Sequence, residues 1–153
     1  MIGTWDIFYD QNNRSVIFQE FASHGNLQEY IKQNNVFVPE QQAAEWAKQI
    51  YQGMDFLGSQ GICHRAINPK HILLTAAADD ANRTLVKLGS FRDAIVYYDS
   101  KNGLIRNQPC RPLDKRKIAN YQAPEVFGDA KAEEYDPIVA DIWSFGNATY
   151  GFV

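Results

Sequence analysis

The sequence predicts one α+β domain that combines helices buried along one face with short strands. Two features carry the prediction: an amphipathic helical pattern after Pro39, and short runs of β-branched and aromatic residues such as Ser15–Phe21. The chain has 153 residues, of which 45% are hydrophobic. That length and composition are enough for a single compact core.

The first quarter of the chain predicts a strand followed by a short helix. The strand Ser15–Phe21 runs into the turn Ser23–Gly25. Asn26 then stands where a helix N-cap is expected, and Glu29 three residues later completes a capping box. We therefore expect a helix over Leu27–Lys32.

A longer helix is expected to begin at Pro39. Its apolar residues recur at alternating spacings of four and three, which places them on one buried face. Those residues are Ala43, Ala47, Ile50, Met54 and Leu57, with Trp46 beside them. Gly58 and Gly61 then end the helix.

The second half of the chain predicts a strand pair, a long loop and a last helix. Ile72–Leu74 and Leu85–Leu88 are short apolar runs separated by a polar stretch, as in two hairpin strands. Asp93–Gln122 shows little periodicity and reads as a long loop, which is uncommon in a compact domain unless it has a function. Ile138–Val153 has the pattern of a buried helix.

Charge and cysteine content exclude several classes of partner. The formal net charge of −3 creates no general attraction for nucleic acid or for an anionic membrane, and no apolar stretch approaches the roughly 20 residues of a membrane helix. Cys63 and Cys110 show neither metal-ligand spacing nor a disulfide framework. We therefore expect a cytoplasmic protein that binds neither nucleic acid nor membrane.

Four motifs resemble the signature of one family. Cys63–Leu74 (CHRAINPKHILL) is similar to a His-Arg-Asp catalytic loop, and Val86–Ala94 (VKLGSFRDA) to the strand that enters an Asp-Phe-Gly motif. Tyr121–Glu125 (YQAPE) matches an Ala-Pro-Glu motif, and Asp141–Gly146 (DIWSFG) the start of a central helix. In this order and at these separations, they resemble the protein kinases. The Tyr135–Pro137 segment is similar to the calmodulin-dependent and testis-specific serine kinases.

The resemblance implies a kinase-like fold with a mostly helical large lobe. Residues 1–22 would be a remnant of the small lobe, consisting of its last two strands and the hinge. Residues 23–153 would be a partial large lobe, with the activation segment at about 90–125 and truncated in the central helix. In the family, the hinge backbone at Glu20, Phe21 and Ala22 meets adenine, and Leu73 lies beneath it. In the family, the Gly-rich loop and the phosphate-binding lysine lie upstream of these residues, and we expect this chain to lack both.

Several family positions that carry chemistry hold other residues here. The catalytic base is Ala66, the catalytic-loop lysine is Asn68, and the metal-binding asparagine is His71. The metal-binding aspartate is Ser90, and the glycine after Phe91 is Arg92. A methyl group cannot accept a proton, and losing a general base lowers a rate by roughly 10² to 10⁴. The residues therefore favour a pseudokinase that is not an enzyme, holds no metal and binds ATP weakly or not at all.

Other motif positions keep the family's structural residues. These are His64, Arg65, Phe91, Glu125 and Asp141, of which Asp141 is the carboxylate expected to accept N–H groups of the catalytic loop. Arg65 is open to two interpretations, a receptor for a phosphate on the activation segment or the partner of a nearby carboxylate.

The role of His71 and the function of the whole chain also stay open. His71 would either fill space at a strand entry or use its imidazole as a base or as a ligand of a transition metal. The leading function is a protein-binding scaffold. The alternatives are a Ser/Thr kinase fragment or a truncated gene product without a role of its own. We also expect the last helix to expose Trp143, Phe145, Tyr150 and Phe152, which would promote oligomers or binding to a protein partner.

Overall fold

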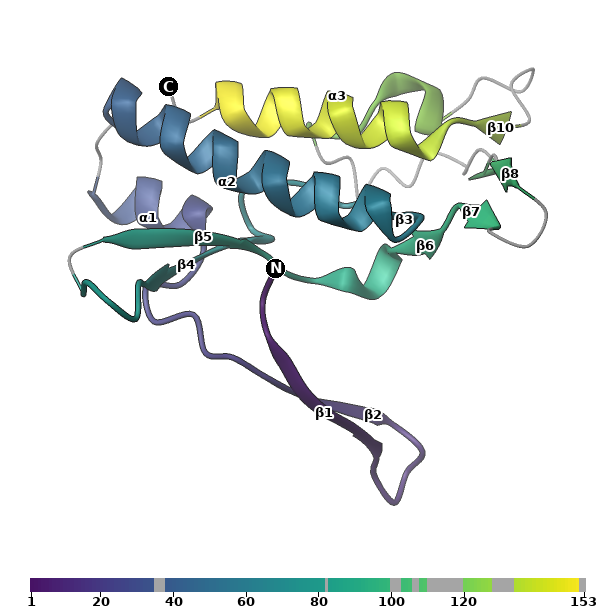
Figure 1. Cartoon of the computed structure of the whole chain (residues 1–153), viewed down its shortest axis with the longest axis horizontal. Helices are drawn as coiled ribbons and strands as arrows, with labels where there is room; N and C mark the ends of the chain where they lie inside the picture. The colour runs from purple at the N-terminus through teal and green to yellow at the C-terminus, as the bar shows by residue number, and fades with distance from the viewer. Residues whose placement is uncertain are drawn as a thin grey trace.

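A computed structural model describes residues 1–34, 38–81, 83–99, 103–105, 108–109, 120–127 and 134–151. It confirms an α+β fold with small antiparallel sheets beside the helices (Figure 1). The elements are β1 (Thr4–Tyr9), β2 (Ser15–Gln19), α1 (Leu27–Asn34), α2 (Glu40–Ser59), β3 (Ile62–Cys63), β4 (Ile72–Ala76), β5 (Thr84–Leu88), η1 (Phe91–Asp93), β6 (Ile95–Val96), β7 (Tyr98–Asp99), β8 (Leu104–Ile105), β9 (Gln108–Pro109), η2 (Pro124–Phe127), β10 (Glu134–Tyr135) and α3 (Pro137–Tyr150).

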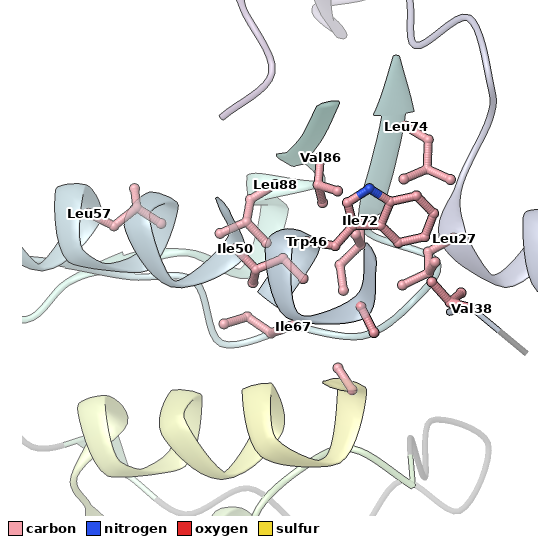
Figure 2. Packing of buried hydrophobic residues seen from close by; sticks show 12 residues of the cluster. Leu27, Val38, Trp46, Ile50, Leu57, Ile67, Ile72, Leu74, Val86 and Leu88 are labelled. Atoms are coloured by element: carbon pink, nitrogen blue, oxygen red, sulfur yellow. The ribbon is translucent and has the colours of Figure 1, made fainter. Parts of the chain in front are cut away.

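Helix α2 forms the centre of the core. It begins after Pro39 as predicted, and its buried residues are Ala43, Trp46, Ile50 and Leu57. Trp46 is 1% exposed, so it belongs to the buried stripe itself. These side chains pack against β4, β5 and α1 (Figure 2). The helix ends at Ser59, which lies between the two glycines, Gly58 and Gly61, that were predicted to end it.

The predicted hairpin in the middle of the chain is confirmed as β4 paired with β5. The strands are antiparallel, with Ile72 opposite Leu88 and Leu74 opposite Val86. These four side chains are all nearly inaccessible to solvent, because they lie between the sheet and α2. The pair therefore supplies the sheet half of the core.

Both outer edges of this strand pair are covered by other parts of the chain. On the β5 side, Gln49 of α2 accepts a hydrogen bond from Val86 N–H (2.8 Å). On the β4 side, His24 N–H donates to the Leu74 carbonyl (3.0 Å), and Leu74 N–H donates to the Gly25 carbonyl (2.9 Å). Unpaired backbone groups are thus satisfied without a wider sheet.

The β1–β2 hairpin extends away from this core (Figure 1). Ile7 pairs with Ile17 and Phe8 with Val16, and the rings of Phe8 and Phe18 stack 5.4 Å apart. The strand predicted over residues 15–21 ends at Gln19, and the side chain of the next residue, Glu20, bonds to Lys87 of β5.

Helix α1 begins with the predicted cap, since Asn26 Oδ1 accepts a hydrogen bond from Glu29 N–H (3.0 Å). Helix α3 lies beside α2 (Figure 1). The Asp136 carboxylate caps it by accepting from Ile138 N–H at 2.8 Å. None of the helices in the described ranges is long and apolar enough to cross a membrane.

Two predictions about the second half need correction. The segment predicted as a loop contains short strands, because β6 pairs with β3 and β7 with β8. On α3, Trp143 is 49% and Tyr150 is 86% exposed, as expected, but Phe145 is half-buried against the core and its ring lies 6.5 Å from that of Tyr51. Phe152 and residues 110–119 of the expected activation segment lie outside the described residues.

Candidate functional site

A buried carboxylate fixes the loop that follows β3. Asp141 of α3 accepts the backbone N–H of His64 on Oδ2 (2.6 Å) and the backbone N–H of Arg65 on Oδ1 (2.8 Å). Burial raises the pKa of Asp141 to about 6, while the two hydrogen bonds favour the ionised form. One side chain thus joins segments that lie 77 residues apart in sequence.

His64 connects this loop to the end of β5. The side chain is fully buried, and its Nε2 lies 2.8 Å from the Gly89 carbonyl, which can only accept. The proton is therefore on Nε2, and Nδ1 accepts from Ala66 N–H at 3.3 Å. Burial lowers the pKa of His64, and its ring lies 5.0 Å from that of Phe91. His64 is accordingly a neutral, fully bonded core residue.

The backbone is unusual at the two places that flank His64 and Phe91. Arg65 (φ 63°) and Ser90 (φ 62°) both adopt the left-handed conformation without being glycine. Such residues persist only where the surrounding structure holds them, and they are enriched at functional sites. Arg65 Nε is buried without a hydrogen-bond partner among the described residues. Arg92 is exposed and lies 3.9 Å from the Asp93 carboxylate.

Ala66, Asn68 and His71 form one polar cluster around a single carbonyl. The Ala66 carbonyl accepts from Asn68 Nδ2 (2.9 Å) and from His71 Nδ1 (2.7 Å), while Asn68 Oδ1 accepts from Lys70 N–H (2.9 Å). His71 therefore carries its proton on Nδ1. Its Nε2 keeps a free lone pair, because the described residues offer it no hydrogen-bond partner.

The expected hinge residues lie between the hairpin and α1. Phe21 is 83% exposed, and Ala22 is half-buried. Glu20 is held by Lys87 of β5, whose Nζ lies 2.6 and 2.7 Å from the two carboxylate oxygens. Lys87 lies opposite Leu73 in the β4–β5 pair. Lys87 therefore connects Glu20 of the expected hinge with the strand position next to the residue expected beneath adenine.

Sequence analysis missed two residues that this arrangement needs. Lys87 gave no signal beyond its strand position, because its partner lies 67 residues away. Gly89 supplies the carbonyl that bonds His64, and it packs closely against Leu73, because a Cβ at Gly89 would lie 2.7 Å from Leu73 Cδ1 and the leucine side chain would have to shift. The position of Gly89 directly after an apolar strand and before a turn could have indicated its importance.

The remaining expected site residues lie apart from this cluster. Glu125 is half-buried in η2, beside a small second core formed by Ala123, Val126, Tyr135 and Ala140. A cavity of about 640 Å³ lies between α2 and β5, and none of the expected site residues lines it. No group of three or more His, Cys, Asp or Glu side chains that could hold a metal occurs among the described residues.

The known proteins to which this chain is similar are protein kinases. The family model "Protein kinase domain" matches residues 1–153. A putative serine/threonine-protein kinase A of Trypanosoma brucei brucei is 30% identical over 146 residues, covering 93% of the chain and 30% of that protein. A probable serine/threonine-protein kinase WNK6 of Oryza sativa is 34% identical over 140 residues (90% and 27%). Tyrosine-protein kinase JAK1 of Danio rerio is 28% identical over 148 residues (92% and 11%).

These relatives correct one prediction. The substitutions at Ala66, His71 and Ser90 led us to expect a chain outside any enzyme class, whereas the relatives are named as kinases, mostly of the serine/threonine class. The chain spans less than a third of the length of these relatives. The family match over the whole chain shows that this chain belongs to the protein kinase family.

Proposed function

We propose that the chain is part of a serine/threonine protein kinase domain, which transfers the γ-phosphate of ATP to a hydroxyl group of a protein. The observation that carries the proposal is the grip of Asp141 on the backbone of His64 and Arg65. Phosphoryl transfer depends mainly on the positioning of the reacting groups. A catalytic loop whose backbone is fixed by a buried carboxylate would supply that positioning. The serine/threonine class is supported by the names of most relatives.

The hinge fits an adenine ring. Within the described residues, no hydrogen bond uses the Glu20 carbonyl or the Ala22 N–H. One acceptor and one donor separated by a single residue complement the amine and the ring nitrogen on one edge of adenine. Leu73 of β4, which the family resemblance places beneath adenine, would supply an apolar surface for the ring. These three residues support binding of the base.

The same residues do not fit a magnesium ion. Mg²⁺ prefers carboxylate oxygens, but the two family positions for its ligands hold Ser90 and His71. We therefore derive no step through a metal.

His71 is the group that we assign as proton acceptor, since Ala66 has only a methyl side chain. Its hydrogen bond to the Ala66 carbonyl fixes the proton on Nδ1 and leaves Nε2 basic. The proton of the substrate hydroxyl would pass to Nε2 as the oxygen attacks the γ-phosphorus and ADP leaves.

The state of Cys63 bears on where in the cell we propose that the protein acts. Buried Cys63 is a free thiol whose pKa is raised to about 12 by burial, so it is an inert packing residue. A free cysteine of this kind supports a cytoplasmic location.

Two measurements test the function. Adenosine is titrated into the chain by NMR, where we expect shifts at residues 20–22 and at Leu73, and we expect Mg²⁺ to add little to the affinity for ATP. Labelled ATP is then supplied, with serine, threonine and tyrosine peptides, to the longest product of the gene that contains the chain. We expect label on serine or threonine, and less label with His71→Gln.

Each outcome is decisive. Failure of adenosine to bind would overturn the adenine site, and label on tyrosine alone would overturn the serine/threonine class. Nucleotide binding without any transfer would overturn the kinase reaction. Unchanged transfer in His71→Gln would remove His71 as proton acceptor while leaving the rest of the proposal in place.

A further inference from the structure

Among the described residues, the hydrogen bonds that join the β1–β2 hairpin to the rest of the molecule lie at its base. The hairpin extends away from the core (Figure 1), and large side chains on its two faces, including the consecutive residues Ile7 (59%) and Phe8 (44%), are exposed. A two-stranded hairpin is marginally stable by itself. Its orientation therefore depends on contacts where it meets the body.

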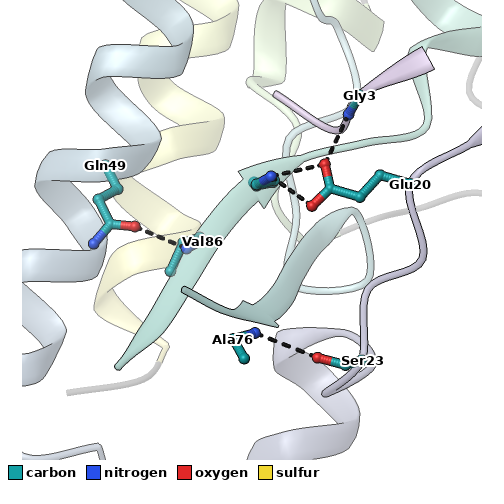
Figure 3. Close-up of polar contacts among 7 residues, drawn as sticks. Gly3, Glu20, Ser23, Gln49, Ala76 and Val86 are labelled. Atoms are coloured by element: carbon teal, nitrogen blue, oxygen red, sulfur yellow. Dashed lines mark hydrogen bonds and ion pairs between the residues drawn. The ribbon is translucent and has the colours of Figure 1, made fainter. Parts of the chain in front are cut away.

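Three segments meet at that base around one carboxylate. Glu20 Oε2 accepts from Gly3 N–H at 3.2 Å, and both carboxylate oxygens accept from Lys87 Nζ at 2.6 and 2.7 Å (Figure 3). Two backbone hydrogen bonds of 2.8 Å accompany them, from Ile2 N–H to the Leu88 carbonyl and from Glu20 N–H to the Gly3 carbonyl. The start of β1, the end of β2 and strand β5 are thus tied together.

This ion pair is more shielded from solvent than another pair on the same side of the molecule. The side chains of Lys87 and Glu20 are 24% and 27% exposed, whereas those of Arg83 and Asp79 are 55% and 73% exposed. The hydrogen bond from Lys87 lowers the pKa of Glu20, so the carboxylate stays charged at neutral pH. Partial removal of water strengthens such a pair relative to an exposed one.

The position of Lys87 gives the pair a consequence for ligand binding. Lys87 lies directly opposite Leu73 in the β4–β5 register, and opposite residues project from the same face of a sheet. The pair therefore sets the spacing between the hinge backbone at residues 20–22 and Leu73. Those are the two walls of the adenine site proposed above.

We propose that Lys87 is a positioning residue, which acts through Glu20 to fix the hinge and the β1–β2 hairpin against β5. The hairpin part stands on the contacts alone, whereas the effect on adenine rests on the proposed function. Removing either charge frees the hinge to move away from Leu73.

Hydrogen exchange of the 153-residue chain tests the hairpin part. We expect Lys87→Met and Glu20→Gln to speed exchange of the β1–β2 amides by about tenfold, with α2 amides unchanged. Lys87→Arg keeps the charge and should restore protection, and Arg83→Met serves as the control that removes only the exposed pair. Unchanged exchange in the hairpin, or equal acceleration in α2, would overturn the proposal.

Adenosine affinity tests the link to the site. We expect Lys87→Met to weaken adenosine binding by about tenfold and Lys87→Arg to keep it. If the unaltered chain does not bind adenosine, the proposed adenine site fails, and the exchange experiment still decides the hairpin. Equal affinity in the unaltered chain and Lys87→Met would overturn the positioning role. The charge exchange Glu20→Lys with Lys87→Glu provides a second test, because hairpin protection must return if the pair itself is responsible.

Discussion

Asp141 stabilises this molecule through two hydrogen bonds that it accepts, as a buried carboxylate, from a distant loop. Its oxygens reach the backbone of His64 and Arg65, where the Arg65 conformation is itself unfavourable. A buried carboxylate that accepts two charge-assisted hydrogen bonds contributes more to the free energy of unfolding than a carboxylate on the surface does. The backbone at His64 and Arg65 is therefore held by one residue of α3.

Asp141→Asn should lower the free energy of unfolding at pH 7 by about 2–3 kcal/mol, because the new amide group would oppose one backbone N–H with another donor. Urea denaturation followed by circular dichroism measures the change. Asp79→Asn is the matched control, since Asp79 is an exposed surface carboxylate, and it should change little. Equal effects of the two substitutions would contradict the role given to Asp141.

His64 predicts how stability varies with pH. Burial lowers its folded-state pKa below the ordinary value of 6.5, so its contribution is fully present above pH 6.5 and is lost as the pH falls through the folded pKa. We expect His64→Gln, which cannot titrate, to show a shallower loss of stability between pH 7.5 and 5.5. A slope in His64→Gln equal to that of the unaltered chain would contradict this role for His64.

At the scale of elements, the C-terminal end of α2 is positioned by a close approach between two backbones. Gly61 has φ 69°, and a Cβ there would lie 2.9 Å from Tyr98 Cβ. The contact brings β7 against the turn that leads into β3 and the catalytic loop. A glycine at this position is therefore required by the packing of two elements.

Gly61→Ala should destabilise the chain by about 1–2 kcal/mol, because it adds both left-handed strain and a clash. Gly58→Ala is the comparison, since Gly58 lies in α2 with nothing near its Cβ position, and should stabilise by up to about 1 kcal/mol. Thermal or urea unfolding of the two variants measures both the expected loss of stability in Gly61→Ala and the expected gain in Gly58→Ala. A stabilised Gly61→Ala variant would show that this end of α2 adjusts freely.

At the scale of the whole molecule, much apolar surface stays exposed. On α3 the side chains of Val139, Ile142 and Trp143 are about half exposed and that of Tyr150 is 86% exposed, and the β1–β2 hairpin is exposed on both faces. Contiguous apolar surface of this kind marks a place of association with other protein. We therefore propose that α3 carries an interaction surface.

We expect the chain to form oligomers at micromolar concentration, and we expect Ile142→Lys to shift it toward monomer. Sedimentation velocity measures the distribution. Trp5→Lys tests the hairpin separately, since it leaves α3 unchanged. A monodisperse monomer in the unaltered chain, or oligomers that respond only to Trp5→Lys, would contradict the proposal for α3.

Local sequence patterns determined much of this protein. The 3.6-residue period located α2, the Asn26 cap located α1, and two apolar runs located the β4–β5 pair. These patterns arise from neighbours a few residues apart, so they can be read along the chain. The motif order likewise identified the kinase family, although the residue changes at the site led to a wrong conclusion about enzyme class.

The family resemblance predicted one contact between distant segments, that of Asp141 with the loop at His64 and Arg65, but only the tertiary structure decided the others. Phe145 is half-buried because α3 packs beside α2. The expected loop after Asp93 forms strands because β3 pairs with β6, and because Gly61 leaves room for Tyr98 of β7. Lys87 reaches Glu20 across 67 residues of sequence. Such contacts depend on the arrangement of whole elements in space, and no periodicity or short motif in the sequence encodes that arrangement.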